Sequence, residues 1–427
     1  MKVCVIGAGY VGATTAACLA ELGHNVCCID IDEEKVDKIN AGSPPIHEDC
    51  LKELLQKHVG KRLRATTDYD TIADSDVCFI CVGTPSGPNG EIDLSLIKAA
   101  SKSVGITLKN SENYHVIAVK STVVPETTQN VIIPIIEEHS QKKAGADFGI
   151  VMNPEFLREG NAIHDFMHPD RVVIGELDER SGEIVAQLYK DLNAPMIRID
   201  LKTAEMIKYA SNAFLATKIS FSNEIGNMCK MLGIDVYDVM RAVGLDQRIS
   251  PHFLQAGVGF GGSCFPKDVK ALIHKAEMLG YQPKVLKSVM DVNEEQPERM
   301  ICLLERRAGN ISGKKIAVLG LAFKNDTDDI RESRAIPAIR MLLEKGGNVS
   351  TYDPLANENM RAIFPDVEYC HSAKDALKDA DACLVMTEWE EFKKLGDEFN
   401  VMKNKIVIDG RKVITPRKDI DYEGLCW

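Results

Sequence analysis

The first 200 residues alternate short apolar runs with stretches in which apolar residues recur every three or four positions. Short apolar runs predict buried strands, and the intervening pattern predicts amphipathic helices. Alternation of the two is typical of doubly wound α/β domains, so we expect a parallel sheet with right-handed crossovers. The predicted strands are Lys2–Ile6, Asn25–Asp30, Val77–Val82, His115–Lys120, Gly149–Met152 and Arg171–Gly175.

The pattern changes at residue 201. From there to about residue 232 the chain contains no proline, and its first glycine is Gly226. The stretch is mostly apolar and rich in small residues, which predicts one long helix buried on several sides. Such a helix is suited to be a domain spine or a dimer interface. Further helical pattern continues to about residue 308.

The last third of the chain weakly repeats the first. After the connector Gly309–Gly313, strands are predicted at Lys314–Gly320, Asn348–Asp353, Asp381–Met386 and Lys405–Asp409. The run ending at Gly320 resembles the run ending at Gly7, but the glycines that follow Gly7 have no counterpart. We therefore expect a second Rossmann-like domain whose first loop does not cradle a dinucleotide. The predicted domains are 1–200 (nucleotide-binding), 201–308 (helical) and 309–427 (Rossmann-like).

Composition removes several function classes. A net charge of −12 argues against nucleic-acid binding, which needs a basic face. No apolar run reaches the 18 residues of a membrane span. The 13 cysteines are odd in number and unpatterned, and many lie in apolar runs; this indicates buried free thiols and a cytoplasmic protein. Cys78 and Cys81 have C-x-x-C spacing, but residues three apart in a strand point to opposite faces. His164 and His168 are four residues apart, but Pro169 argues against a helix there and no third ligand is suggested, so no metal is expected.

A glycine motif after the first predicted strand indicates the cofactor. Gly7, Gly9 and Gly12 form G-x-G-x-x-G between a strand and a helix, and Asp30 ends the next strand. The glycines permit a tight turn and close approach of a pyrophosphate to the helix N-terminus. Asp30 is placed to bind the ribose hydroxyls, and its charge repels a 2′-phosphate, so NAD is favoured over NADP.

Three further strand ends should face the same crevice, because ligands bind outside the carboxyl ends of parallel strands. Thr84 and Thr122 follow two of them, where a turn-forming role is as plausible as ligand binding. Glu155 and Glu159 follow the third. A carboxylate there can serve as a general base toward water or as a salt-bridge residue of the loop.

The segment Gly259–Asp268 carries the strongest chemical signal. Its closely spaced glycines allow the backbone to approach a ligand. Cys264 follows them, near the expected start of a helix and close to Lys267. A helix N-terminus and a nearby ammonium group both lower the pKa of a thiol, so Cys264 is predicted to be a nucleophile. A buried structural thiol is the alternative, and it suits the other twelve cysteines better.

Lys208 and Asn212 are four residues apart on the predicted long helix and share one of its faces. Both are polar within an apolar stretch. If buried, they need partners, which a substrate oxyanion and an ordered water would provide. The alternative is a polar surface stripe.

Taken together, these segments resemble the UDP-glucose/GDP-mannose dehydrogenase family. The matching stretches occur in the family's order over nearly the whole chain: Gly7–Gly12, Ser121–Val123, Asn153–Gly160, Lys208–Asn212, Gly259–Asp268 and Ala322–Ser333. The phrase Asn153–Glu159 and Phe265 look more like the members that act on UDP-glucose than like the N-acetylmannosamine or GDP-mannose branches.

The resemblance implies an NAD-dependent, four-electron oxidation of UDP-glucose to UDP-glucuronate through a thiohemiacetal and a thioester on Cys264. It implies catalytic roles for Glu155, Lys208, Asn212, Asp268 and Thr122 as well. It implies NAD contacts from Val11, Asp30, Lys35, Thr84, Thr122, Glu159, Lys267 and Arg331. The substrate contacts that it implies are Glu155, Phe156, Leu157, Arg158, Glu159, Lys208, Asn212, Phe253, Leu254, Gln255, Ala256, Gly257, Gly261, Lys324 and Arg411.

The resemblance further implies a homodimer, in which Arg248 reaches the substrate of the neighbouring subunit. Three alternatives stay open. GDP-mannose or another nucleotide sugar is the second choice of substrate. A two-electron hydroxy-acid dehydrogenase also pairs a Rossmann domain with a helical domain, but it needs neither Cys264 nor a second Rossmann-like domain. A protein that only senses NAD would not need Lys208, Cys264 and Asp268 together.

Overall fold

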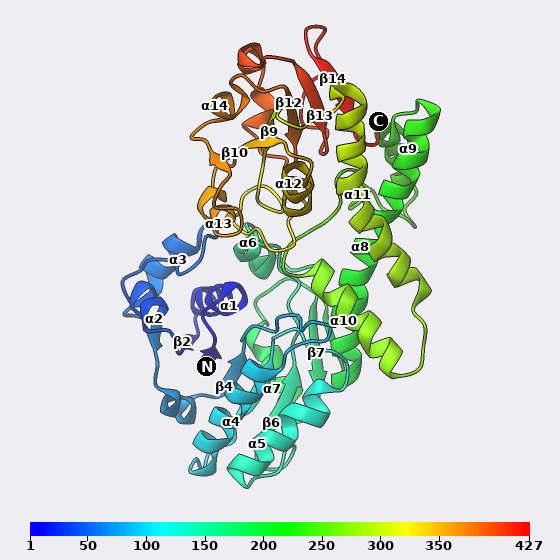
Figure 1. Ribbon diagram of the computed structural model, residues 1–427. Helices are drawn as coiled ribbons and strands as arrows, with labels where there is room; N and C mark the ends of the chain where they lie inside the picture. Colours follow the sequence, from blue (N-terminus) through cyan, green and yellow to red (C-terminus); the bar gives the residue numbers. More distant parts are fainter. The chain divides into compact units, whose positions relative to one another are not determined.

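The computed structural model describes all 427 residues, which divide into two compact units, 1–211 and 212–427. Figure 1 shows the course of the chain, coloured from blue to red. One helix, α8 (Leu201–Leu232), crosses the division between the units. Its bounds agree with the long helix predicted from the sequence. The predicted α/β class is confirmed, with two sheets and a helical segment between them along the chain.

The first unit contains an eight-stranded sheet in the order β3-β2-β1-β4-β5-β6-β7-β8. Its strands are β1 (Lys2–Ile6), β2 (Asn25–Ile29), β3 (Leu63–Thr66), β4 (Val77–Ile80), β5 (Val116–Val119), β6 (Gly149–Met152), β7 (Val172–Glu176) and β8 (Met196–Asp200). The helices are α1 (Tyr10–Glu21), α2 (Glu33–Asn40), α3 (Leu51–His58), α4 (Ser95–Lys109), α5 (Ile133–Ser140), α6 (Ala162–Met167) and α7 (Glu179–Leu188). A 3-10 helix (Tyr69–Asp74) and a π-helix (Thr128–Ile132) complete this unit.

The sheet departs from the predicted parallel arrangement at one pair of strands. β7 runs antiparallel to β6, and all other neighbours are parallel. Two strands were not predicted, β3 and β8. Both lie at the edges of the sheet, and β8 is largely exposed, so neither has the continuous apolar run of a central strand.

Alternate residues of the central strands enter two apolar clusters, one on each face of the sheet. Val3 and Val5 belong to one cluster, and Cys4 and Ile6 to the other. Cys78 and Cys81 likewise fall on opposite faces, as expected for strand residues three apart. α4 and α5 lie side by side on this unit (Figure 1).

The second unit contains a six-stranded parallel sheet in the order β11-β10-β9-β12-β13-β14. The strands are β9 (Lys315–Leu319), β10 (Asn348–Tyr352), β11 (Glu368–Tyr369), β12 (Ala382–Val385), β13 (Ile406–Asp409) and β14 (Asp421–Gly424). The helices are α9 (Val236–Gly244), α10 (Phe265–Met278), α11 (Lys284–Ala308), α12 (Ala335–Glu344), α13 (Asn357–Arg361) and α14 (Ala373–Leu377). Phe392–Lys394 and Asp397–Val401 form 3-10 helices.

The turn after β1 in the first sheet and the turn after β9 in the second have similar geometry. Gly7 and Gly320 both have left-handed φ values, +99° and +93°, and each donates its N–H to the end of the adjacent strand. α1 begins three residues after Gly7, whereas α12 begins only at Ala335. The second turn therefore does not lead directly into a helix N-terminus, in agreement with the predicted loss of a dinucleotide cradle.

The carboxylates that follow β2 and β10 also differ. Asp30 directly follows β2 and accepts two backbone N–H groups, from Ala8 and Asp32. Asp353 directly follows β10 and accepts five donors, four backbone N–H groups and the indole of Trp389. Because a carboxylate has about four acceptor positions, Asp353 has none left for a ribose.

Candidate active site

The glycine turn after β1 has room for a pyrophosphate at one position only. A Cβ atom on Gly12 would lie 1.7 Å from the carbonyl oxygen of Gly7, and one on Gly7 would lie 2.8 Å from that of Cys81. A Cβ on Gly9 would meet no heavy atom within 4 Å. Gly9 is also the N-cap of α1, and no side chain caps that helix end. Open space at an uncapped helix N-terminus fits a phosphate group.

Asp30 is suited to bind ribose hydroxyls. Its carboxylate is 8% exposed, and each oxygen accepts one backbone N–H, at 2.6 Å from Ala8 and 3.0 Å from Asp32. Each oxygen keeps a second acceptor position, so the residue is oriented but not saturated. Lys35 lies on α2 with its ammonium 3.7 Å from Asp32, and Val11 lies in the first turn of α1.

A pair of glycine variants separates cofactor binding from folding. We expect Gly12→Ala to lower the melting temperature strongly, because its Cβ overlaps the Gly7 carbonyl. Gly9→Ala should fold normally but bind NAD at least about tenfold more weakly, because the methyl group fills the space beside the helix N-terminus. Thermal melting and NAD titration by fluorescence measure both effects. Normal NAD affinity in Gly9→Ala would contradict this placement of the pyrophosphate.

Thr84 and Thr122 are brought together at neighbouring strand ends. The Thr84 hydroxyl donates to the Thr122 carbonyl at 2.9 Å. Ser121 donates to the carbonyls of Ile80 and Val82, which ties the end of β5 to the end of β4. The contact shows a turn-forming role for Thr84. Its hydroxyl also holds Thr122 at the crevice end of the sheet.

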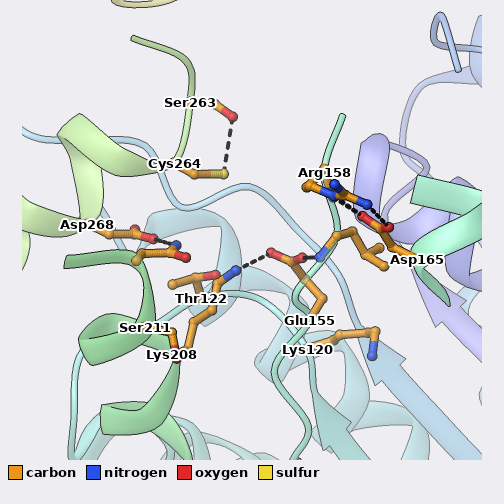
Figure 2. A network of polar contacts seen from close by, with 12 residues as sticks. Lys120, Thr122, Glu155, Arg158, Asp165, Lys208, Ser211, Ser263, Cys264 and Asp268 are labelled. Carbon is orange, nitrogen blue, oxygen red and sulfur yellow. Dashed lines mark hydrogen bonds and ion pairs between the residues drawn. The ribbon is translucent and has the colours of Figure 1, made fainter. Parts of the chain in front are cut away.

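Glu155 and Lys208 form a buried ion pair in the first unit, 2.8 Å between Oε1 and Nζ (Figure 2). Their side chains are 6% and 3% exposed, which excludes the surface-stripe alternative for Lys208. Burial tends to raise the pKa of the Glu155 carboxyl. The charge and hydrogen bond of Lys208, the Leu157 N–H and the charge of Lys120 outweigh it, so the pKa is lowered. Glu155 is therefore ionised at neutral pH.

The rest of the segment after β6 is fixed by other contacts. Arg158 is exposed and makes a bidentate ion pair with Asp165. The ring of Phe156 lies under the guanidinium of Arg171, 3.9 Å from its centroid. Beyond Glu159, the N–H groups of Gly160 and Ala162 donate to the buried carboxylate of Glu48. The segment is thus held along its length in the first unit.

In the second unit, Cys264 is the N-cap residue of α10, as predicted. Its thiol is half-buried and lies 3.5 Å from the Ser263 hydroxyl (Figure 2). The Asp268 N–H donates to the Cys264 carbonyl and closes the first helical turn. Among the other twelve cysteines, Cys50 and Cys302 are exposed, so the prediction that all of them are buried is wrong for these two. All 13 cysteines are free.

Asp268 is buried, at 1% exposure, and links two other candidate residues. Its Oδ2 accepts from the Asn212 amide at 2.6 Å, and its Oδ1 accepts from the Lys267 ammonium at 2.5 Å. Asn212 is itself buried. The Asn212 amide, for which a substrate partner was expected, is therefore hydrogen-bonded to the Asp268 carboxylate within the protein.

The glycines before Cys264 are required by protein neighbours. A Cβ on Gly259 would lie 2.6 Å from Asn293 Oδ1, one on Gly261 would lie 2.3 Å from the Glu332 carbonyl, and one on Gly262 would lie 2.7 Å from the Phe323 ring. The Gly262 N–H also donates to the Arg331 carbonyl. The backbone here thus packs closely against α11 and the segment after β9, and the expected close approach to a ligand stays a prediction.

The remaining predicted substrate residues lie in loops of the second unit. Gly257 donates its N–H to Asn223, and Val258 donates to the Gly410 carbonyl, which joins the 253–257 segment to the loop after β13. In that loop Arg411 donates through Nε to the Met386 carbonyl. Of the others, Leu254 and Ala256 are buried, and the exposed or half-buried ones are Phe253 (φ +63°), Gln255, Lys324 and Arg248, which pairs with Asp246. Arg331, predicted as an NAD contact, is exposed and pairs with Asp329.

Sequence reasoning missed two buried charged groups beside these segments. Lys120, at the end of β5, contacts Asn153. Asp409, at the end of β13, accepts the N–H groups of Arg411, Val413 and Ile414 and so shapes the Arg411 loop. Burial raises the pKa of Asp409, although these hydrogen bonds oppose the rise. Both could have been identified in the sequence, because each is a charged residue at the carboxyl end of an apolar strand.

No group of three or more His, Cys, Asp or Glu side chains is arranged to hold a metal ion. No helix is both long and apolar enough to cross a membrane.

Three family models match successive parts of the chain. Residues 1–193 match the NAD binding domain of the UDP-glucose/GDP-mannose dehydrogenase family, residues 202–295 its central domain, and residues 317–416 its UDP binding domain. The first match confirms the NAD prediction made from Gly7–Gly12 and Asp30.

Individual proteins match over their full length. UDP-glucose 6-dehydrogenase of Haloferax volcanii is 52% identical over 430 residues, 100% of both chains. GDP-mannose 6-dehydrogenase of Pseudomonas savastanoi is 40% identical over 443 residues, again 100% of both. The solved structure of a UDP-glucose dehydrogenase from Pyrobaculum islandicum is similar with a TM-score of 0.94 and 42% identity, and covers 100% of this chain and 98% of that one. The chain therefore belongs to the UDP-glucose/GDP-mannose dehydrogenase family of NAD-dependent oxidoreductases.

Proposed function

We propose that the chain oxidises the primary alcohol at C6 of UDP-glucose to the carboxylate of UDP-glucuronate. The observation that carries the proposal is Cys264, a half-buried thiol at the N-terminus of α10 with the carboxylate of Asp268 in the following turn. The name of the 52% identical relative and the UDP binding domain matched by residues 317–416 support the choice of substrate.

The complete reaction converts one alcohol, two NAD⁺ and one water into one carboxylate, two NADH and three protons. NAD, when bound, accepts the hydride in each of the two oxidations. Gly9 and Asp30 hold its pyrophosphate and ribose. Val11, Lys35, Thr84, Thr122, Glu159, Lys267 and Arg331 complete the proposed contacts.

Cys264 carries the sugar between the two oxidations. Its thiolate adds to the aldehyde carbon and forms a C–S bond, while the former carbonyl oxygen takes up a proton. Loss of a hydride from the same carbon, together with release of the proton from its hydroxyl oxygen, leaves a thioester. Water then adds, the C–S bond breaks, and the thiolate is restored. The positive end of the α10 dipole favours the thiolate both as the nucleophile that attacks the aldehyde and as the group that leaves the thioester.

Glu155 and Asp268 are the two candidate bases for the water step. Glu155 is kept ionised by Lys208, and Asp268 is oriented by Asn212 and Lys267. Lys208 also supplies an ammonium to oxyanions formed along the path, and Thr122 helps to orient water. The amide of Asn212 has the same function as Lys208 from one turn further along α8.

Substrate recognition is divided between two groups of loops. The proposed contacts are the segment Glu155–Glu159 with Lys208 in the first unit, and Asn212, Phe253–Gly257, Gly261, Lys324 and Arg411 in the second. The two cationic groups Lys324 and Arg411 suit a diphosphate. We propose the same three domains as the sequence suggested, 1–200, 201–308 and 309–427.

A panel of nucleotide sugars tests the substrate assignment. We expect kcat/KM for UDP-glucose to exceed that for GDP-mannose and UDP-N-acetylmannosamine by at least about 10²-fold, because a site built to hydrogen-bond one base and one sugar leaves polar groups unpaired when either is replaced. NADH formation at equal substrate concentrations measures this. GDP-mannose, the substrate in the name of a 40% identical relative, would replace UDP-glucose if its kcat/KM were higher.

An exposed apolar stripe on α8 supports a homodimer. Phe214, Phe221 and Met228 follow one another at seven-residue spacing and are 64%, 50% and 48% exposed. Residues seven apart share one helix face, so the three form a stripe that a second copy of the helix would bury. In such a dimer Arg248, which is exposed and paired only with Asp246, reaches the neighbouring subunit. Thirteen free cysteines support a cytoplasmic location.

The dimer is tested by one substitution in this stripe. We expect the wild-type chain to sediment as a dimer and Phe221→Glu to sediment as a monomer, because the variant buries an unpaired carboxylate at the interface. Analytical ultracentrifugation at micromolar concentration distinguishes the two. Arg241→Glu, at an exposed site on α9, is the control and should remain dimeric. A monomeric wild type would refute the proposed interface.

A further inference from the structure

Lys120 is a buried lysine that the proposed reaction does not use. It follows β5 directly and is 4% exposed. Its ammonium group makes no ion pair with a carboxylate. It donates to Asn153 Oδ1 at 3.1 Å, to the Tyr189 hydroxyl at 3.4 Å and, more weakly, to the Asn153 carbonyl at 3.5 Å.

Aromatic rings enclose the rest of this ammonium group. Its Nζ lies 5.6 Å from the centroid of Phe79, 5.8 Å from that of Phe166 and 5.7 Å from that of Tyr189. Ring faces attract cations, but they replace only part of the hydration that a lysine loses on burial. A methionine would fill the same space without this cost, so packing alone does not explain a charged residue here.

The contacts of Lys120 converge on Asn153. The Asn153 side chain accepts from Lys120 and from the Tyr189 hydroxyl, the latter at 2.6 Å, and donates to the Val173 carbonyl at 2.8 Å. Its backbone N–H donates to the Val119 carbonyl. Every polar group of Asn153 is therefore held, and its conformation sets the direction in which the chain leaves β6.

Glu155 is two residues further along this same segment. In Figure 2 the Lys120 side chain lies close to Glu155, and no bond joins them. The two still interact through space, because the charge of Lys120 lowers the pKa of the Glu155 carboxyl. Lys120 thus acts on Glu155 by two routes: the geometry of the backbone and the electrostatic potential.

We propose that Lys120 is a positioning residue that holds the Glu155 side chain in place through Asn153 and Tyr189. The inference rests on the proposed function, in which Glu155 contacts the substrate. The charged and titratable groups that face Lys120 are Cys18 on α1, Cys81 after β4, Glu155 after β6, Tyr189 after α7 and Lys208 on α8.

The charge state of Lys120 is consistent with this role. Burial lowers its pKa to about 8, and Lys208 contributes in the same direction, while Cys81, Glu155 and Cys18 oppose them. The group is then roughly nine-tenths protonated at pH 7.

A double-mutant cycle on the full-length chain tests the proposal. We expect Lys120→Met to lower kcat for UDP-glucose about tenfold, with the KM values for UDP-glucose and NAD changed less than twofold. In a Glu155→Gln background, the same Lys120→Met substitution should change kcat less than twofold, because it acts through the carboxylate already removed. Lys102→Met, at an exposed position on α4, is the control and should change nothing.

Two outcomes overturn the inference. Equal effects of Lys120→Met in the wild-type and Glu155→Gln backgrounds would assign it a structural role independent of Glu155. An unchanged kcat in Lys120→Met would show that catalysis does not depend on Lys120. If Lys120→Met does not fold, Tyr189→Phe, which removes one hydroxyl from the network, replaces it in the same cycle with the same expectation. A wild-type chain that forms no NADH with UDP-glucose would instead overturn the proposed function, and the inference with it.

Discussion

Cys264→Ser is expected to lower kcat for the oxidation of UDP-glucose to the acid by about 10³-fold or more. A serine hydroxyl at the N-terminus of α10 remains protonated at neutral pH and is a far weaker nucleophile than a thiolate. The variant should fold normally, because the thiol is half-buried and its hydrogen-bonding contact, the Ser263 hydroxyl, can also bond to serine. Steady-state NADH formation and the melting temperature measure the two effects.

A second cysteine provides the matched control. Cys302 lies on α11 in the same unit and is exposed, and Cys302→Ser should retain full activity. Covalent capture also predicts that a quenched wild-type reaction contains a sugar adduct on the peptide with Cys264, detectable by mass spectrometry. Cys264→Ser with near wild-type turnover would rule out a covalent path through this residue.

Lys208→Met is expected to reduce both activity and stability. Removing the ammonium deprives developing oxyanions of a donor, which lowers kcat by about 10²–10³-fold in comparable sites. It also leaves the buried Glu155 carboxylate without its ion-pair partner, a change that costs about 3–5 kcal/mol. In a unit of this size we expect a fall of roughly 10 °C in melting temperature at pH 7.

The double variant Lys208→Met/Glu155→Gln separates the two losses. It should recover most of the melting temperature, because no buried charge remains unpaired, and recover none of the activity. The destabilisation by Lys208→Met should also depend on pH. Since the folded pKa of Glu155 is lowered, the pair stabilises the protein above the unfolded value of about 4.3, and this contribution is lost as pH falls. A melting-temperature gap between the wild type and Lys208→Met that stayed constant as pH fell from 7 to well below 4, through the lowered folded pKa of Glu155, would contradict this role of the pair.

The central strands of both sheets were predictable because each is a continuous apolar run that packs on both faces. β1, β6 and α8 have the bounds expected from the pattern alone. The edge strands β3, β8, β11 and β14 were not predicted. Their residues are partly exposed, and the neighbouring strand, not their own apolarity, orders them. The antiparallel pairing of β6 with β7 was not predicted either, because both strands are buried apolar runs and such a run does not specify the direction of its neighbour.

The candidate site was predictable where a residue type implies its chemistry locally. The glycine turn, Asp30 and the position of Cys264 at a helix start depend only on neighbours in sequence. The partners of Lys208 and Lys120 lie 53 and 33 positions away in the sequence, and no local pattern specifies them. The glycines before Cys264 are instructive as well. The sequence predicted that these positions have no room for a Cβ atom. The atoms that such a Cβ would meet belong to Asn293, Phe323 and Glu332.

The number of NADH molecules formed per UDP-glucose tests the central claim most directly. With limiting UDP-glucose, excess NAD⁺ and wild-type enzyme, the reaction is followed to completion by NADH absorbance, and the sugar product is identified by mass spectrometry. Capture of the aldehyde by Cys264 and oxidation of the adduct predict two NADH and UDP-glucuronate. One NADH with an aldehyde product would show a two-electron dehydrogenase and contradict the covalent role of Cys264.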